Sequence, residues 1–393
     1  MKKSLLALSL IGATGLSAEC CSPCIDCECY TPAFHQLDCD WGTFIDVEFL
    51  YWYARETNLP YAAVITAQRV APEIDRLIYA TDSYERLKTR WDPGARIGIG
   101  WNDSCDGWDL FLHWTYFHST KRNSTSVPAD FGQEELFEPL ENEQAIINPY
   151  VNPSYLFSSL PSGQRTYNKV RASWKLNFNA IDLELGRKYW LSRCFTLRPF
   201  SGVRVAWTRT NFKTRSIREV EPIVMEQASF LEIDQDRFLN HVWGAGFLLG
   251  LQPTWYFCQS FALFGNLDLA LLWGKVKAKK NEQYNAAVGE DPSMVITDFD
   301  NQYSDRFSTM HPILDLAIGL RFEDCFCCNR YRFALDLGWE HHTWFDHSHR
   351  VLALDGQRSA PTATPETTSY ASFFEPNGNL VYGGLVVRGR FDF

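Results

Sequence analysis

Acidic and basic side chains recur at every second position of otherwise apolar segments, and these residues have the clearest chemical potential. Asp46 and Glu48 alternate with apolar residues near the start, as Arg388 and Arg390 do near the end. Charged groups lining a water-filled β-barrel would set its ion selectivity, whereas in a narrow barrel they would close the interior with salt bridges. The predicted lumen-lining residues are Asp46, Glu48, Asp109, Asp182, Glu184, Arg204, Asp268, Asp315, Arg321, Arg332, Asp336, Arg388 and Arg390.

Cysteines form a second reactive set, six near the N-terminus and six in or beside predicted short turns. They are Cys20, Cys21, Cys24, Cys27, Cys29, Cys39, Cys105, Cys194, Cys258, Cys325, Cys327 and Cys328. If all face the oxidising periplasm, disulfides within or between chains are expected, and thiols on one side suggest cross-linking of neighbouring molecules. The CxxC pair Cys24 and Cys27 could instead be redox-active or bind zinc, but no distal CxxC accompanies it, so we predict no metal site.

A cluster of imidazoles surrounds Asp346 and comprises His341, His342, His347 and His349. Such a cluster could bind a divalent metal, but a polar strand end next to an outer loop is the favoured interpretation. Ser348 lies between two of these histidines, which brings a serine close to a histidine as a Ser–His hydrolase pair would require, but no sequence motif of a hydrolase surrounds it. The sequence therefore predicts no catalytic residue and no cofactor.

The charged side chains would be positioned by β-strands, because the apolar and polar residues alternate with a period of two. About ten segments show the alternation, each long enough to cross a bilayer, which needs about 9–11 residues. Each segment runs roughly 12 to 20 residues, and the alternation is clearest at residues 43–53, 95–101, 108–116, 170–185, 203–207, 245–251, 263–273, 314–320, 333–339 and 381–391. This predicts an all-β fold, an antiparallel transmembrane barrel of about ten strands, with between about 8 and 16 allowed.

One of these segments changes phase near Asn179. Before it, Val170 and Phe178 belong to the apolar set, whereas after it Ile181 and Leu185 do. We expect either a β-bulge, which shifts the alternation by one residue, or a hidden hairpin.

The connections between the segments alternate in length. Long polar gaps are predicted near 55–87, 121–166, 213–236, 280–305 and 348–378, and short turns near 103–106, 192–193, 258–260 and 324–329. Outer-membrane barrels have long external loops and short periplasmic turns. The pattern therefore places both ends of the barrel in the periplasm, and the long gaps could hide further hairpins.

The N-terminus has the features of an export signal. Lys2 and Lys3 precede a short apolar stretch, residues 5–16, and the small residues Ser17 and Ala18. The stretch is too short for a membrane anchor, which needs about 20 residues. We predict a signal peptide over 1–18, a Cys-rich periplasmic segment over 19–40 and the barrel over 41–393.

The C-terminus ends in an alternating strand. Phe391, Gly389 and Val387 share one face, while Asp392 and Arg390 share the other. Phe391 and the terminal Phe393 are predicted to form the signal that the outer-membrane assembly machinery recognises. The alternative is an edge strand of a soluble sandwich.

The composition argues against two other classes of protein, helical membrane proteins and nucleic-acid-binding proteins. The chain is 15% aromatic with a mean hydropathy of −0.24, and its densest apolar run, Gly244–Leu251, is too short for a membrane helix. The formal net charge of −10 argues against nucleic acid as a partner. An exported barrel with lipid on one side of each strand fits this combination.

Three segments together resemble a known family. Residues 181–207 read IDLELGRKYWLSRCFTLRPFSGVRVAW, residues 41–52 read WGTFIDVEFLYW, and the last strand ends in Phe. They are similar to the major outer-membrane-protein-like family of Legionella and chlamydia-related bacteria, from about residue 40 to the end. The resemblance implies an abundant surface barrel with porin activity, disulfide cross-linking and sometimes adhesion, and it brings no catalytic residue.

The sequence thus predicts a porin of the cell outer membrane that lets small polar solutes diffuse passively. The alternative is a surface adhesin or structural outer-membrane protein without significant channel activity. Expected partners are membrane lipid, the barrel assembly machinery, neighbouring envelope proteins through disulfides and a host-cell surface.

Overall fold

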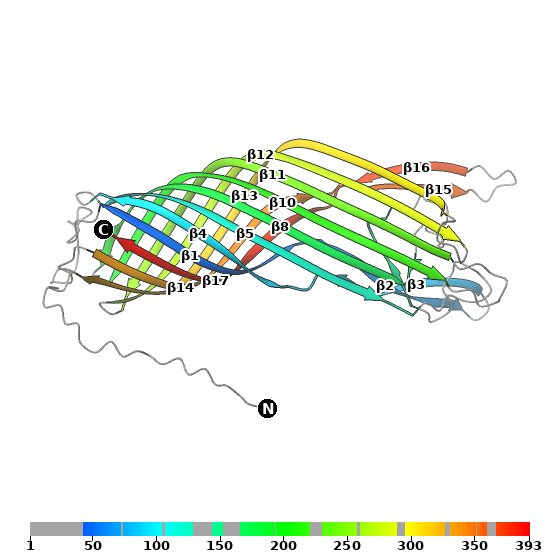
Figure 1. Cartoon of the computed structure of the whole chain (residues 1–393), viewed down its shortest axis with the longest axis horizontal. Coiled ribbons are helices and arrows are strands. Elements are labelled where there is room, and N and C mark those ends of the chain that lie inside the picture. Colours follow the sequence, from blue (N-terminus) through cyan, green and yellow to red (C-terminus); the bar gives the residue numbers. More distant parts are fainter. Residues whose placement is uncertain are drawn as a thin grey trace, which may run out of the picture.

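A computed structural model describes residues 42–71, 74–103, 107–128, 144–151, 166–192, 194–220, 230–257, 260–288, 295–326, 331–350, 352–359 and 367–393. Ten of its strands close into one antiparallel barrel (Figure 1). These are β1 (Thr43–Glu56), β4 (Trp91–Asn102), β5 (Trp108–Ser126), β8 (Lys169–Arg187), β10 (Phe195–Val220), β11 (Phe230–Tyr256), β12 (Phe261–Val288), β13 (Val295–Phe326), β14 (Tyr331–His349) and β17 (Asn377–Asp392).

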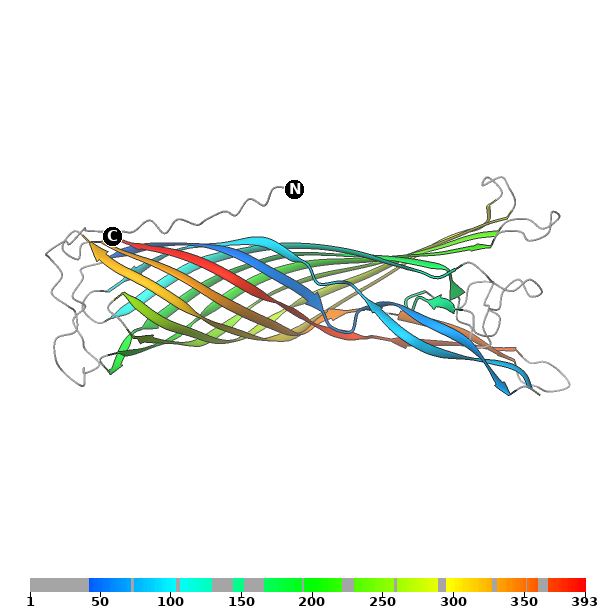
Figure 2. The same cartoon turned by 90° about the horizontal axis from the view of Figure 1, so that it is seen from below.

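The barrel closes by pairing the first strand with the last. Phe44 of β1 lies opposite Asp392 of β17, and the ring continues from β1 through β4, β5, β8 and β10 to β14 and back to β17. A closed ring leaves no strand edge unpaired, as a strand that crosses lipid requires. The predicted fold class and strand number are therefore confirmed. Because the strand number is even, the start of β1 and the C-terminus lie at the same end (Figure 2).

The outer face of the barrel carries a band of large apolar side chains. Ile45, Val47 and Phe49 of β1 are about half exposed, while Asp46 and Glu48 between them are buried inside. The same alternation runs around the ring, with Phe247 of β11 and Trp273 of β12 among the most exposed side chains. An apolar exterior around a charged interior is stable only when lipid covers the outside. We take this band to mark the membrane-spanning part of each strand.

β8 crosses the phase change near Asn179 without interruption. Its pairing with both neighbours is continuous, so the expected bulge or hairpin is wrong. Phe178 and its even-numbered neighbours point inward along the whole strand, and Ile181 points outward. The phase changes because the surroundings of the strand change. Beyond the apolar band the outer face of β8 meets water instead of lipid, so its apolar residues lie on the inner face, in a packed interior.

Four strands continue far beyond the apolar band. β10 to β13 are 26, 27, 28 and 32 residues long, whereas about 9–11 residues span a membrane. The predicted polar gaps at 213–236 and 280–305 are therefore mostly strand, not loop. These strands extend well past the other barrel strands (Figure 1), and outward residues such as Lys213, Arg215 and Arg237 are polar because this part of the sheet faces water.

Further hairpins lie at the outer end, as the long gaps allowed. β2 (Pro60–Ala71), β3 (Ile74–Arg86), β6 (Gln144–Ile147) and β7 (Thr166–Tyr167) form a small sheet, and β15 (Leu352–Ser359) pairs with β16 (Thr367–Phe374). The short β9 (Tyr189–Ser192) pairs with β10 near the other end. No helix in the described ranges is long and apolar enough to cross a membrane.

Candidate functional site: the barrel interior

All thirteen predicted lumen residues lie on the interior face of the barrel. Asp46, Asp182 and Asp315 are at most 3% exposed, and the arginines among the thirteen reach inward from β10, β13, β14 and β17. The backbone alternation places them there, because every second residue of a barrel strand points inward. Whether they control ion passage remains a prediction. Their pairing, however, is given directly by the structure.

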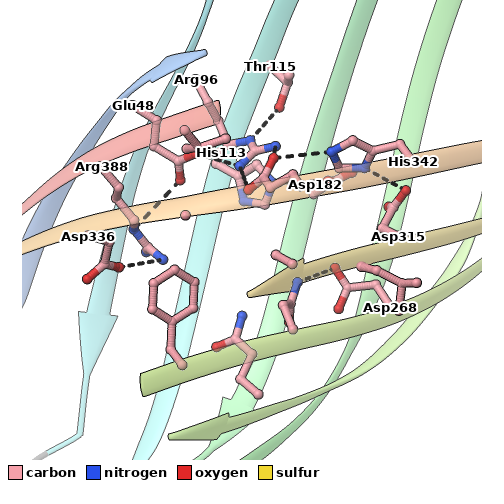
Figure 3. Close-up of a pocket in the computed structure, with 18 of the residues that line it drawn as sticks. Glu48, Arg96, His113, Thr115, Asp182, Asp268, Asp315, Asp336, His342 and Arg388 are labelled. Carbon is pink, nitrogen blue, oxygen red and sulfur yellow. Dashed lines mark hydrogen bonds and ion pairs between the residues drawn. The ribbon is translucent and has the colours of Figure 1, made fainter. Parts of the chain in front are cut away.

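Arg204 is the centre of one ion network. Its Nε donates to Asp182 on β8 at 2.7 Å, and its Nη1 donates to Asp315 on β13 at 2.5 Å. Two strands lie between β10 and β13 in the ring, so this guanidinium bridges part of the lumen. His113 and His342 complete the network, contacting Asp182 at 3.0 Å and Asp315 at 2.8 Å (Figure 3).

Arg96 of β4 is the centre of the second network. It donates to Glu48 at 2.5 Å and, through both terminal nitrogens, to Glu340 on β14 at 3.1 Å. His342 joins the two networks, because its Nε2 lies 3.1 Å from Glu340. Arg96, His113, Glu340 and His342 were not among the predicted lumen residues. The same two-residue alternation identifies them, since each shares a face with a predicted residue.

Towards the periplasmic end the remaining arginines are also paired. Arg388 donates to Asp46, and Arg321 donates to Asp336 at 2.8 Å. The other pairs are Arg198 with Asp109 and Glu184, Arg332 with Glu323, and Arg390 with Asp392. Asp268 accepts a hydrogen bond from Asn266 at 2.6 Å and has no ion-pair partner within the described segments. Each interior arginine named here is therefore paired with a carboxylate of the chain itself.

Two polar cavities lie in tandem along the barrel axis. One, of about 110 Å³, is bordered by the Arg204 and Arg96 networks, and the other, of about 120 Å³, is nearer the periplasmic end. Arg321, Arg388 and Gln252 line both. Each has room for several water molecules, and its polar walls supply the partners that buried water needs. Neither approaches the width of an open porin channel.

An aromatic cluster closes the lumen on the outer side of the cavity that the Arg204 and Arg96 networks border. Phe178 of β8 contacts Trp344 of β14, with ring centroids 5.6 Å apart. The ring order β8-β10-β11-β12-β13-β14 in one direction and β8-β5-β4-β1-β17-β14 in the other places these strands diametrically opposite. Tyr382, Trp52 and Phe117 pack against this contact, and Trp344 Nε1 donates to the Tyr382 hydroxyl at 3.0 Å. We call these five residues the aromatic plug.

A segment following β6 covers the outer mouth. Tyr150 packs edge-on against Phe212 and Phe238, and its backbone oxygen accepts a hydrogen bond from Lys280 Nζ at 2.8 Å. Burial raises the pKa of Tyr150 to about 12. Burial likewise raises the pKa of Asp236 to about 7, opposed by Lys280 at 3.3 Å. The interior beyond the membrane is therefore a packed core and not a wide vestibule.

The histidines predicted to cluster point in different directions. His342 belongs to the ion networks, whereas His347 is buried beside His311, with ring centroids 6.4 Å apart. Burial and the neighbouring imidazoles lower the pKa of His347 to about 3. His349 pairs with Glu375 at 3.0 Å. The described residues contain no group of three or more metal-binding side chains.

Two of the twelve cysteines can be placed. Cys194 is exposed next to the start of β10, and Cys325 is half-buried near the end of β13. Both lie at the end of the barrel that carries the C-terminus, because Cys325 lies opposite Arg332, which lies opposite Asp392, and the Cys194 carbonyl accepts a hydrogen bond from the Tyr256 backbone N–H. The other ten fall outside the described residues, as do the predicted signal peptide and the Cys-rich segment. The disulfides therefore stay a prediction.

A closed antiparallel barrel with an apolar exterior and a charged interior defines an outer-membrane β-barrel protein. The family model described as Legionella pneumophila major outer membrane protein precursor matches residues 39–384. The chain belongs to this family, as the sequence resemblance predicted, and is a protein of the outer membrane. No curated protein matches the sequence.

Solved barrels resemble the chain only distantly. The outer membrane protease OmpT from Escherichia coli is 11% identical, with 92% of this chain and 99% of that chain covered and a TM-score of 0.37. A Pseudomonas aeruginosa FadL homologue is 7% identical over 90% of each chain, with a TM-score of 0.22. The toluene transporter TodX of Pseudomonas putida is 10% identical over 89% of each chain, with a TM-score of 0.24.

Proposed function

We propose that the protein is a passive channel for small ions and polar solutes, and that the aromatic plug is its constriction. The tandem polar cavities carry this proposal, because they extend from the periplasmic end to the plug and are lined by charged side chains. Diffusion down a gradient needs only a wet path, so the proposal assigns no cofactor and no catalytic residue. The porin predicted from the sequence is thereby specified as a small channel that is occluded in this structure.

The plug is suited to intermittent opening. Phe178 and Trp344 meet across the lumen and are not neighbours on adjacent strands. A hydrophobic constriction gates a pore by excluding water, and it opens when its side chains move apart. Rotamer changes at these rings, together with displacement of the segment that carries Tyr150 and covers the outer mouth, would join the cavities to the exterior without breaking any strand pairing of the barrel.

Planar-bilayer conductance of the refolded protein tests the proposal. Wild-type protein should give small, infrequent steps. Phe178→Ala combined with Trp344→Ala should give more frequent steps, at least about twice as large, because the constriction is removed. Phe247→Ala is the matched control, since it removes an outward ring that is 76% exposed. Silence from both wild type and double variant, with folded protein in the bilayer, would contradict a channel.

Such silence would support a second candidate, a structural or adhesive barrel without channel activity. The observation that favours it is the same contact between Phe178 and Trp344, which closes the lumen in this structure. The outer hairpins β2–β3 and β15–β16 would then present the binding surface (Figure 1). Binding of the protein to host cells, retained while conductance is absent, would distinguish this candidate.

The envelope contacts predicted from sequence belong to the same proposal. We expect a signal peptide over 1–18, disulfides between periplasmic cysteines of neighbouring molecules, and recognition of Phe391 and Phe393 by the assembly machinery. The exposure of Cys194 supports the cross-linking proposal. Non-reducing electrophoresis of outer membranes should show oligomers that reducing agent dissolves, and a Cys194→Ser variant should change their pattern.

A further inference from the structure

The outer surface of the long strands carries cations in register, just beyond the apolar band. Arg209 of β10 lies opposite His241 of β11, which lies opposite Lys277 of β12, which lies opposite Arg306 of β13. All four residues point away from the barrel interior. Directly opposed residues on one face have Cβ atoms about 5 Å apart, and like charges there destabilise a sheet.

Further cations lie in neighbouring rows of the same surface. Lys213 lies opposite Arg237, and Lys275 follows Trp273 by two residues on β12. We define the basic belt as Arg209, Lys213, Arg237, Lys275, Lys277 and Arg306. A groove crosses the surface just beyond it, lined by Lys213 and Arg237 of the belt together with Arg122, Arg171 and Arg215.

No carboxylate of the described chain neutralises the belt. Arg237 Nε donates only to the Asn211 side chain, at 3.3 Å, and no ion pair to any of the six is present in the described segments. Asp236 also borders the groove, but it is buried on the inner face beside Lys280. Arg306 and Lys279 lower the pKa of Lys277, and partial burial together with Arg237 lowers the pKa of Lys213. The belt is therefore a surface whose counter-charge must come from another molecule.

The belt borders the apolar band directly. Trp207 lies opposite Trp243, and Trp243 lies opposite Lys275. Arg209 and Lys275 follow Trp207 and Trp273 by two residues, a spacing of about 7 Å along a strand. A molecule with an anionic head and acyl chains would contact cations and tryptophans at once, whereas a soluble polyanion would contact only the cations.

We infer that the basic belt binds the phosphorylated headgroup of a lipid in the outer leaflet, whose acyl chains lie along the apolar band below. The site is local to one side of the barrel. On the opposite side, the row formed by Thr343, Val381 and Arg55 contains one cation. The inference is independent of whether the lumen conducts.

Lipid titration of the folded, full-length protein in detergent tests this inference. The probe is lipid A, a bisphosphorylated and acylated glucosamine disaccharide, followed by tryptophan fluorescence. Wild-type protein should bind it. Arg209→Gln, Lys277→Gln and Arg306→Gln combined should weaken binding roughly tenfold or more, because three charge-assisted contacts are lost.

The matched control removes three exposed cations elsewhere, by Arg55→Gln, Lys88→Gln and Arg90→Gln, and should bind as wild type does. Equal weakening in both variants, or in neither, overturns the inference. Complete competition by inorganic phosphate, or binding of heparin without binding of lipid A, also overturns it, since the ligand would then be soluble. The migration shift of unheated protein on a denaturing gel verifies that each variant is folded. If the triple variant of the belt does not fold, the single substitution Arg306→Gln is tested in its place.

Discussion

Two lysines three residues apart on β12 have opposite surroundings. Lys280 points inward, is 2% exposed, and lies 3.3 Å from Asp236 with Glu282 beside it. Lys277 points outward and lies opposite Arg306 on the neighbouring strand, and it forms no ion pair within the described segments. The inner cations named here are paired with carboxylates of the chain, whereas those of the basic belt on the outer surface are not paired within the described segments. The inner charges therefore determine how stable the barrel is, and the outer charges determine what it can bind.

The largest expected effect comes from breaking an interior network. Arg204→Met should lower the free energy of unfolding by about 3 kcal/mol, because it leaves Asp182 and Asp315 buried with only histidine partners. Urea titration of the refolded barrel in lipid vesicles measures it. Lys277→Met, the same kind of change on the outer surface, should not lower the unfolding midpoint, because it removes only the repulsion from Arg306. Equal effects of the two substitutions would remove the contrast between the surfaces.

A charge reversal on the outer surface should separate stability from binding. Arg306→Glu places a carboxylate opposite Lys277, which relieves the repulsion between these neighbours. Opposite charges at facing positions stabilise a sheet modestly, so we expect unfolding at slightly higher urea together with weaker lipid A binding. Arg306→Gln should weaken binding less. A gain in lipid A affinity for Arg306→Glu would contradict the assignment of the belt.

Salt should act on the two surfaces unequally. Raising the ionic strength from about 0.1 M to about 1 M shortens the screening length from about 10 Å to about 3 Å. Lipid A binding at the exposed belt should fall severalfold, while the unfolding midpoint should change little because the interior pairs are shielded from solvent. The comparison needs sodium chloride at matched pH, and binding that is insensitive to salt would argue against phosphate recognition by these cations.

The smallest expected effect is the pH dependence contributed by His241. Partial burial, together with Arg209, Lys277 and Lys279, lowers its pKa, so His241 is neutral near pH 7. A bound phosphate favours the protonated form, and affinity should therefore rise as the pH falls from about 7.5 to about 5.5. In the His241→Gln variant, the part of the increase in affinity that His241 contributes should be lost. Subtracting the pH profile of this variant from that of the wild type removes the contribution from titration of the phosphate itself. Identical profiles would exclude His241 from the site.

Alternation allowed the sequence to predict much of the interior. Asp46, Arg204 and Asp336 were assigned to the lumen because they share a face with other polar residues, and all three point inward. The same reasoning failed beyond the membrane. On β8 the apolar residues around Phe178 were read as a shifted lipid face, although they are the core of a strand that has entered water.

The contacts that close the lumen could not be predicted. Arg204 and Asp315 are 111 residues apart in sequence, and Phe178 and Trp344 meet only because β8 and β14 lie opposite in the ring. Predicting these contacts requires the strand number, the tilt and the register together, because these set the diameter of a barrel. A two-residue period contains none of this information.

The sequence by itself determined that the chain forms an outer-membrane barrel, because lipid imposes an apolar residue at every second position and the closed ring needs an even run of such strands. It also determined which side chains share a face. Only the tertiary structure decided which cations are neutralised. Lys280 meets Asp236 of the neighbouring strand β11 on the inner face, whereas the register brings Lys277 opposite Arg306 on the outer face. Charge compensation depends on distances between strands, and those distances exist only once the barrel has closed.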